Sequence, residues 1–257
     1  MATFLNTILD EKKKEVIRLQ KIFLEYPPHR PGKKGKVVNF KGSGTRVIIA
    51  EIKRRSPSRG DIRKSLDPRR VASEYISAGA RGISVLTDGK FFGGSREDLE
   101  SVVSVAGEIP VLRKDFIIAR EQVYETVMMG ADMVLFIARV LGKKLLKSLV
   151  SLSSDLGLSP LVEVHSLHEL DWAVESEAEL IGINNRDLVT FHVDTEISKK
   201  LLPHIPDDRT KIVESGLKSS EEMEELEEMG ADAFLVGETI VSAPFPGDIL
   251  KKLLGSN

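Results

Sequence analysis

The chain has 257 residues, of which 41% are hydrophobic and 30% are charged, and its formal net charge is −2. A chain of this length can bury a full core as one domain, since α/β barrels of about 200–250 residues are commonly single domains. The small net charge provides no basic field that would indicate nucleic-acid or membrane binding. The chain has no cysteine, which excludes disulfides and thiolate metal sites. No apolar run approaches the roughly 20 residues of a membrane span.

The first segment, residues 4–25, has apolar residues at helical spacing with Lys and Glu between them. We expect an extra N-terminal helix here, ended by Pro27 and Pro28. Residues 1–14 lack the apolar core of a signal peptide, which indicates a cytoplasmic protein. Residues 26–46 are basic and rich in Gly and Pro, and we expect a connecting loop.

From Val47 onward, short apolar strands alternate with amphipathic helices. The expected strands are 47–53, 82–87, 111–116, 133–138, 161–165, 180–184, 211–214 and 233–237. The expected helices are 68–78, 96–106, 120–129, 143–156, 167–176, 194–202, 219–229 and 246–254.

Eight strand–helix units without a Gly- and Pro-rich linker favour a (β/α)8 barrel over an open doubly wound sheet. A Rossmann fold would also need a Gly-rich turn after the first strand, and residues 54–57 do not provide one. We therefore predict a single TIM-barrel domain over residues 1–257. Residues 1–46 would form the helical extension and loop, and residues 47–257 the barrel.

Polar side chains stand at the ends of several expected strands. They are Glu51 and Lys53, Lys114, Glu163, Asn184 followed by Arg186, and Glu214. In a (β/α)8 barrel the active site lies at the C-terminal ends of the strands. A single residue of this kind is equally well explained by a stabilising ion pair. Acids and bases from five strands at one mouth favour a catalytic site, because close carboxylate and ammonium groups supply general acids and bases.

The last two strands lead into Glu214-Ser215-Gly216 and Gly237-Glu238-Thr239. Loops after the seventh and eighth strands, with the start of a short extra helix, form the common phosphate site of these barrels. Glycine lets backbone amides approach a phosphate closely, although each glycine alone is better explained by a turn. We therefore predict a phosphate site in which the Glu238 backbone amide faces the phosphate and its carboxylate points away.

Two histidines and three aromatic residues have open interpretations. His165 and His168 have no third metal ligand at a suitable spacing, so we interpret them as a loop residue and a helix-surface residue without a metal. Phe91 and Phe92 follow the second strand, where they would either stack on a planar ligand or close the loop over the core. The same two interpretations apply to Phe116.

Eight short motifs occur in the order of the expected strands. They are 49–58 (IAEIKRRSPS), 84–87 (SVLT), 91–95 (FFGGS), 113–117 (RKDFI), 161–165 (LVEVH), 182–188 (GINNRDL), 214–216 (ESG) and 235–238 (LVGE). With them, the chain from Ile8 onward resembles the indole-3-glycerol-phosphate synthase family of tryptophan biosynthesis. The resemblance implies a carboxy-lyase that acts on 1-(2-carboxyphenylamino)-1-deoxyribulose 5-phosphate. Ring closure with loss of CO2 and water would give indole-3-glycerol phosphate, without a metal or an organic cofactor.

The resemblance also implies catalytic roles. Lys114 resembles the general acid that protonates the ribulose carbonyl, and Glu163 resembles the general base of the later proton removal. Lys53 would lie near the substrate carboxylate and is a candidate acid in dehydration. The remaining implied roles are positioning of the lysines and substrate hydroxyls by Glu51 and Asn184, pairing of Arg186 with Glu51, and binding of the ribulose by Glu214.

Binding positions follow from the same resemblance. The matches to phosphate-loop positions are Ser56, Ser215, Gly216, Gly237 and Glu238, and the matches to the apolar anthranilate pocket are Phe92, Phe116, Leu135 and Leu188. The N-terminal helix would lie over the barrel mouth. A general acid works best near the operating pH, so a lysine such as Lys114 would act best if burial or cationic neighbours lowered its pKa towards neutrality.

Two alternatives stay open. Phosphoribosylanthranilate isomerase, the preceding enzyme of that pathway, is also a phosphate-binding barrel, but it would be expected to use a Cys–Asp pair and this chain has no cysteine. A catalytically silent barrel kept as a binding module would have no need for all the polar strand-end residues together. We expect a phosphorylated small-molecule substrate, no nucleic-acid or membrane partner and a monomer, and we leave association with other enzymes of the pathway open.

Overall fold

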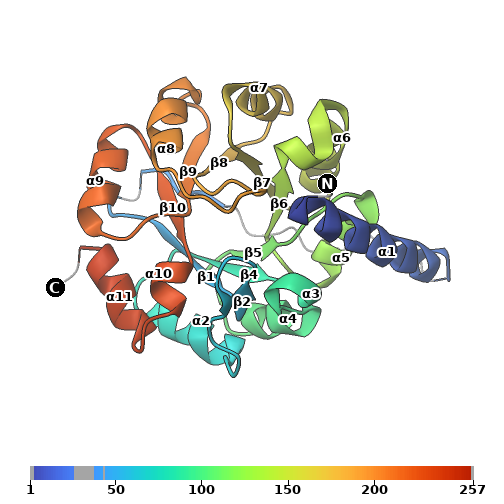
Figure 1. Ribbon diagram of the computed structural model, residues 1–257, viewed down its shortest axis with the longest axis horizontal. Coiled ribbons are helices and arrows are strands. Elements are labelled where there is room, and N and C mark those ends of the chain that lie inside the picture. The colour runs from blue at the N-terminus through green and yellow to red at the C-terminus, as the bar shows by residue number, and fades with distance from the viewer. Residues whose placement is uncertain (1–2, 26–37, 43, 256–257) are drawn as a thin grey trace.

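The structure is a computed structural model that describes residues 3–25, 38–42 and 44–255. Eight parallel strands form a closed barrel in the order β1-β10-β9-β8-β7-β6-β5-β4, with helices around it (Figure 1). The strands are β1 (Ile48–Ile52), β4 (Gly82–Leu86), β5 (Val111–Lys114), β6 (Met133–Ile137), β7 (Ser159–Val164), β8 (Leu180–Asn184), β9 (Thr210–Glu214) and β10 (Ala233–Val236). The predicted (β/α)8 barrel is confirmed.

The larger helices lie close to their predicted positions. They are α1 (Phe4–Glu25), α2 (Pro68–Ser77), α4 (Arg96–Val103), α5 (Arg120–Met128), α6 (Ala138–Asp155), α7 (Leu167–Glu175), α8 (Glu196–Leu201), α9 (Ser220–Glu228) and α11 (Pro246–Leu253). Helix α6 begins five residues before its predicted start, because a first turn joins directly to β6 and Gly142 (φ 68°, ψ 164°) interrupts the helix. None of the described helices is long and apolar enough to cross a membrane.

The alternation of side chains along the strands sorts them into two layers. Ile48 and Ala50 pack between the barrel and its outer helices, whereas Ile49 lies in the cluster inside the barrel. The inner cluster also contains Leu112 and Leu161, and every one of these five side chains is 0% exposed. Since successive residues of a strand point to opposite faces, positions two residues further along from an inner residue also point inward. This alternation sends the strand-end polar residues towards the mouth of the barrel.

Helix α1 packs across part of the mouth. Ile8 is buried, and the Phe4 ring meets the rings of Phe91 and Phe191 edge-on, with 5.3 Å between centroids in both pairs. The connecting loop predicted over 26–46, with its two prolines, lies largely outside the described residues.

Several short elements were not predicted. They are the hairpin of β2 (Arg55–Ser56) with β3 (Gly60–Asp61), the short helices α3 (Gly89–Phe92) and α10 (Glu238–Val241), and the 3-10 turn η1 (Leu202–His204). Elements of two to four residues are too short to show a hydrophobic period, so the sequence pattern does not distinguish them from loops. Three of these elements, the β2–β3 hairpin, α3 and α10, contribute residues to the mouth of the barrel.

Candidate active site

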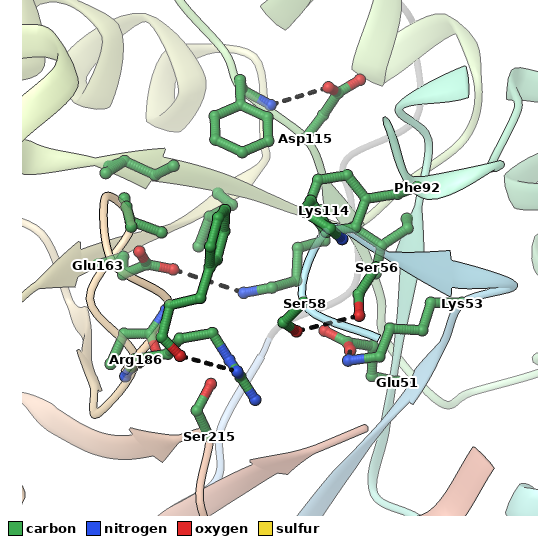
Figure 2. Close-up of a pocket in the computed structure, with 18 of the residues that line it drawn as sticks. Glu51, Lys53, Ser56, Ser58, Phe92, Lys114, Asp115, Glu163, Arg186 and Ser215 are labelled. Carbon is green, nitrogen blue, oxygen red and sulfur yellow. Dashed lines mark hydrogen bonds and ion pairs between the residues drawn. The ribbon is translucent and has the colours of Figure 1, made fainter. Parts of the chain in front are cut away.

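The catalytic candidates come together because they share the inward-facing register. Lys114 is two residues beyond the inner residue Leu112, and Glu163 is two residues beyond Leu161. The Lys114 Nζ lies 2.7 Å from Glu214 Oε2 and 3.5 Å from Glu163 Oε2. Figure 2 shows Lys114 and Glu163 pointing towards each other, with Glu51 and Lys53 on the opposite wall.

Glu51 and Lys53 form the second pair of this cluster. The Lys53 Nζ lies 2.6 Å from Glu51 Oε1. Burial would raise the pKa of Glu51, but Lys53 and Lys114 outweigh burial and lower it. The Glu51 carboxylate is therefore ionised and holds Lys53 against β1.

The pKa of Lys114 departs from its ordinary value in the direction opposite to the one considered from the sequence. Burial alone would lower it, but the carboxylates of Glu214, Glu163 and Glu51 outweigh burial and raise it. The pKa therefore does not fall towards neutrality, because the expectation considered burial and cationic neighbours and omitted the acids that β1, β7 and β9 send to the barrel mouth. Lys114 is held as an ammonium ion, loaded with a proton at neutral pH.

Two buried carboxylate oxygens in this cluster have no hydrogen-bond partner within the described part of the chain: Oε1 of Glu163 and Oε1 of Glu214. Burial raises the pKa of Glu214 to about 6, although Lys114 opposes that change. Unsatisfied buried acceptors are costly and therefore uncommon away from functional sites. Glu163 Oε1 faces the His165 ring, whose Nε2 lies 3.5 Å away, and Glu214 Oε1 packs against Gly182, where a Cβ would lie 2.3 Å from it. The oxygens that face Lys114 are the Oε2 atoms of the two glutamates.

Above this cluster lies a cavity that opens to solvent. Its apolar wall contains the four predicted residues Phe92, Phe116, Leu135 and Leu188. The ring centroids of Phe92 and Phe116 are 6.0 Å apart, so these two side chains pack against each other within the apolar wall. Phe91 packs against α1 instead, and of the two interpretations the core-closing one fits it. Additional lining residues that the sequence did not indicate are Ile8, Leu86, Asp115, Ile137 and Phe191.

A second cavity, of about 380 Å³, extends from the lysines to the ends of β9 and β10 and is lined by Ser215, Gly216 and Gly237. Ser215 and Gly216 both have positive φ, of 66° and 81°. At Gly237 a Cβ would lie 2.2 Å from Glu51 Oε1, so only glycine leaves room for that carboxylate. These three predicted residues thus lie together at one end of the site.

Arg186 and Glu238 differ from what we predicted. Arg186 Nη2 lies 3.1 Å from Glu238 Oε2, so Arg186 pairs with Glu238 and not with Glu51, which is already held by Lys53. Arg59 Nε lies 2.6 Å from the other oxygen, Glu238 Oε1. The Glu238 carboxylate therefore bridges two arginines and lines both cavities, whereas we predicted that it points away.

Asn184 and Ser56 also lie in the site, and both stabilise its loops. Asn184 Oδ1 accepts a hydrogen bond from the Arg186 backbone amide at 2.9 Å, which holds the turn after β8. Ser56 Oγ lies 3.3 Å from Ser58 Oγ within the β2–β3 hairpin. Both Ser56 and Ser58 line the larger cavity.

His165 is a loop residue between β7 and α7, as predicted, but the sequence did not indicate its contact with Glu163. Its side chain is only 2% exposed, and its Nε2 lies 3.5 Å from Glu163 Oε1. His165 is two residues beyond Glu163. The alternation that places Glu163 at the mouth therefore also predicts that the His165 side chain points inward. His168, in contrast, is exposed on α7 as predicted.

The chain forms a closed (β/α)8 barrel. Lysines and glutamates face inward at the carboxyl ends of its strands, beside glycine-containing loops after β9 and β10. This arrangement defines an enzyme with acid–base chemistry at the barrel mouth. A family model described as indole-3-glycerol phosphate synthase matches residues 5–253. The chain belongs to this family, and it is therefore a decarboxylating lyase of tryptophan biosynthesis that forms indole-3-glycerol phosphate.

Individual relatives agree with the family model. The chain is 42% identical over 273 residues to indole-3-glycerol phosphate synthase of Syntrophobacter fumaroxidans, covering 100% of this chain and 99% of the relative. It is 48% identical over 210 residues to the enzyme of the same name from Aquifex aeolicus, covering 81% of each. Among solved structures, thiamine phosphate pyrophosphorylase from Pyrococcus furiosus aligns with a TM-score of 0.61 at 14% identity over 81% of this chain and 93% of that one, which is a likeness of fold alone.

Proposed function

We propose that the reaction proceeds with Lys114 as general acid, Glu163 as general base and Lys53 as the cation that faces the substrate carboxylate. The observation that supports this best is the position of the Lys114 Nζ at the barrel mouth, 3.5 Å from Glu163 Oε2 and 2.7 Å from Glu214 Oε2. That arrangement holds a loaded acid beside an available base, which is what ring closure followed by dehydration requires.

The substrate fits the two cavities by chemistry. Its anthranilate ring would lie against Phe92, Phe116 and Leu188, where an apolar planar group replaces water. Its phosphate would lie beside Ser215 and Gly216 at the other end. Binding at both ends would hold the ribulose carbons beside the lysines, so that phosphate binding energy contributes to orientation of the reacting atoms.

The first step is ring closure. The ring carbon that bears the carboxylate attacks the ribulose carbonyl, and the carbonyl oxygen takes a proton from the Lys114 ammonium group. Attack removes aromaticity, so a positioned acid that neutralises the developing alkoxide lowers the barrier. Loss of CO2 from the same carbon then leaves its electron pair in the ring and restores aromaticity.

The second step is dehydration. Glu163 removes a proton from the methylene carbon next to nitrogen, and the hydroxyl group formed in the first step leaves as water with a proton from a lysine ammonium. The new double bond completes the indole ring. In total one proton is consumed, because a carboxylate leaves as neutral CO2, so Lys114 has to be reloaded from solvent.

The test is turnover of 1-(2-carboxyphenylamino)-1-deoxyribulose 5-phosphate by the purified, chelator-treated protein, followed by indole fluorescence. We expect indole-3-glycerol phosphate, detected by the fluorescence of its indole ring, to form without added metal or cofactor. Glu163→Gln is expected to slow dehydration and to let the ring-closed hydroxy intermediate accumulate, detected by mass spectrometry after a quench. No loss of rate and no accumulation in Glu163→Gln would refute Glu163 as the base.

The proposal also covers the oligomeric state and the cellular location of the enzyme. We propose a monomer in the cytoplasm that binds a phosphorylated small molecule and needs no protein partner for turnover. Gel filtration combined with light scattering checks the monomer. A dimer that persists at the concentration of the assay would contradict it.

A further inference from the structure

His165 lies in a polar pocket directly behind Glu163. Its Nε2 is 3.5 Å from Glu163 Oε1 and 3.2 Å from the Arg186 carbonyl oxygen, in the turn after β8. Its Nδ1 is 3.3 Å from Glu169 Oε2 on α7, and its backbone amide donates to the same oxygen at 2.8 Å. The ring is therefore surrounded by oxygen atoms from three parts of the chain.

The partners of the ring are all hydrogen-bond acceptors. A carbonyl oxygen can only accept, and Glu169 is ionised: burial would raise its pKa, but His165 and Arg139 outweigh burial and lower it. A neutral imidazole carries one N–H and one lone pair, so it can serve only one of two acceptors. An imidazolium donates from both nitrogens and satisfies Arg186 and Glu169 together.

Glu163 has an oxygen that fits this arrangement. Oε2 of Glu163 faces Lys114 at 3.5 Å, while Oε1 has no hydrogen-bond partner within the described residues and has the His165 ring as its nitrogen neighbour. Arg139 completes the group from α6, with its Nε 3.0 Å from Glu169 Oε1. The carboxylate of Glu163 thus lies between the Lys114 ammonium group on one oxygen and the His165 ring on the other.

We propose that His165, as an imidazolium held by Glu169 and the Arg186 carbonyl, is a positioning residue for Glu163. It fixes the plane of the carboxylate, so that one oxygen faces Lys114 and the reacting carbon. This inference rests on the proposed role of Glu163 as the base. Because the same ring also binds the turn that carries Arg186, it connects the base to the end of the site where Arg186 meets Glu238.

The kinetic test compares two histidines of one segment. His165→Gln is expected to lower kcat by about 10²-fold, the size of effect that follows from a misplaced catalytic group, with KM changed little. The matched control is His168→Gln, since His168 is exposed and packs edge-on against Trp172 at 4.5 Å between centroids. The control is expected to retain the wild-type kcat and KM.

A double-mutant cycle separates positioning of Glu163 from a general structural role. In the Glu163→Gln background, His165→Gln is expected to cause no further loss of kcat, because the residue it acts through is already absent. Additive losses would overturn the proposal, and so would a wild-type rate in either single variant.

A second measurement does not depend on turnover. The imidazole nitrogens are followed by 15N NMR at pH 7, and the resonances of His165, one of five histidines, are assigned by their loss in His165→Gln. We expect both nitrogens of His165 to be protonated in the wild-type protein, and Glu169→Gln to abolish this. A neutral ring overturns the inference even in an active enzyme. A protonated ring in a protein that does not convert the substrate would place the fault with the proposed function instead.

Discussion

Lys12 is buried and Lys114 is largely buried, both have carboxylates around them, and both have a pKa raised by those carboxylates against the opposing effect of burial. The Lys12 Nζ, from α1, lies 2.8 Å from Glu15 Oε2, 2.9 Å from Asp88 Oδ2 and 2.8 Å from Asp115 Oδ1. The two sites differ in their access to a cavity.

Around Lys12 the acceptors face donors. Asp115 also accepts from the Phe116 backbone amide and from Thr87 Oγ1, at 2.8 Å and 2.6 Å. Burial would raise the pKa of Asp115, but Lys12 and Arg113 lower it to about 2. The second oxygen of Asp88 accepts from two backbone amides of α3. This cluster fastens α1 to the barrel.

Around Lys114, Glu163 and Glu214 each keep one buried oxygen without a hydrogen bond to any described residue, and the same is true of Asp88 Oδ2 in the Lys12 cluster. Burial, charge and unsatisfied oxygens therefore do not mark the active site by themselves. The Lys114 side chain is 14% exposed and lines both cavities, whereas the Lys12 side chain is 1% exposed. Access from a cavity thus distinguishes a cluster that receives a ligand from one that joins two elements.

The largest effect is expected for Lys114→Ala. It removes the proposed acid, and we expect turnover to fall by about 10³-fold or more, within the range of positioned acid–base groups. Circular dichroism and unfolding in urea check that the fold is retained. Near-normal turnover would refute Lys114 as the acid. The comparison would then no longer separate a catalytic lysine from a structural one.

Lys12→Met is expected to act on stability. Removing one partner of a buried ion cluster leaves uncompensated charge, which costs about 3–5 kcal/mol of unfolding free energy. Urea denaturation measures this. The matched control is Lys13→Met, because Lys13 is exposed and pairs only with Asp10 on the same helix among the described residues, and it should leave the midpoint unchanged. Equal midpoints for both variants would show that the Lys12 cluster contributes no net stability.

Glu214→Gln tests the effect of pH. Because the pKa of Glu214 is raised from 4.5 to about 6 in the folded protein, its carboxylate is protonated in the free enzyme below that pH. We expect kcat/KM to rise with pH through about 6, where ionised Glu214 becomes able to hold Lys114, and the substitution to remove this limb of the profile. If the rise of kcat/KM with pH persists unchanged in Glu214→Gln, the ionisation of another group is responsible for it.

The same group has a consequence for stability with a definite sign. Between pH 4.5 and about 6 the folded protein binds a proton that the unfolded chain has released. The free energy of unfolding therefore falls as pH rises through this window. Glu214→Gln should reduce this decrease of the unfolding free energy with pH. The Asp115 carboxylate behaves in the opposite way, since its lowered pKa means that stability is lost as the pH falls from about 4 to about 2.

The smallest effect is expected for Glu238→Gln. The substitution removes an anion from the proposed phosphate end and frees Arg59 and Arg186, so we expect KM to fall about threefold, a modest change for partly exposed charges. The control is Glu228→Gln, at the exposed end of α9. A raised KM in Glu238→Gln would show that the carboxylate orients the arginines for the substrate.

Much of the architecture was accessible from the sequence because hydrophobic periods report directly on strands and helices. The two-residue alternation also placed Glu51, Lys114 and Glu163 on one mouth. It does not report distances between strands, so the pairing of Arg186 with Glu238 and the direction of the pKa change of Lys114 required the folded structure. Lys12 illustrates the same limit, because its burial depends on acids contributed by distant segments.

The contacts of Lys12 also bear on when α1 can pack during synthesis of the protein. Helix α1 is synthesised before its partners Asp88 and Asp115, which belong to the turns after β4 and β5. A helix of 22 residues can form by itself, but its apolar side has nothing to pack against until those strands exist. Helix α1 thus completes the barrel mouth only after the strands beneath it have come together.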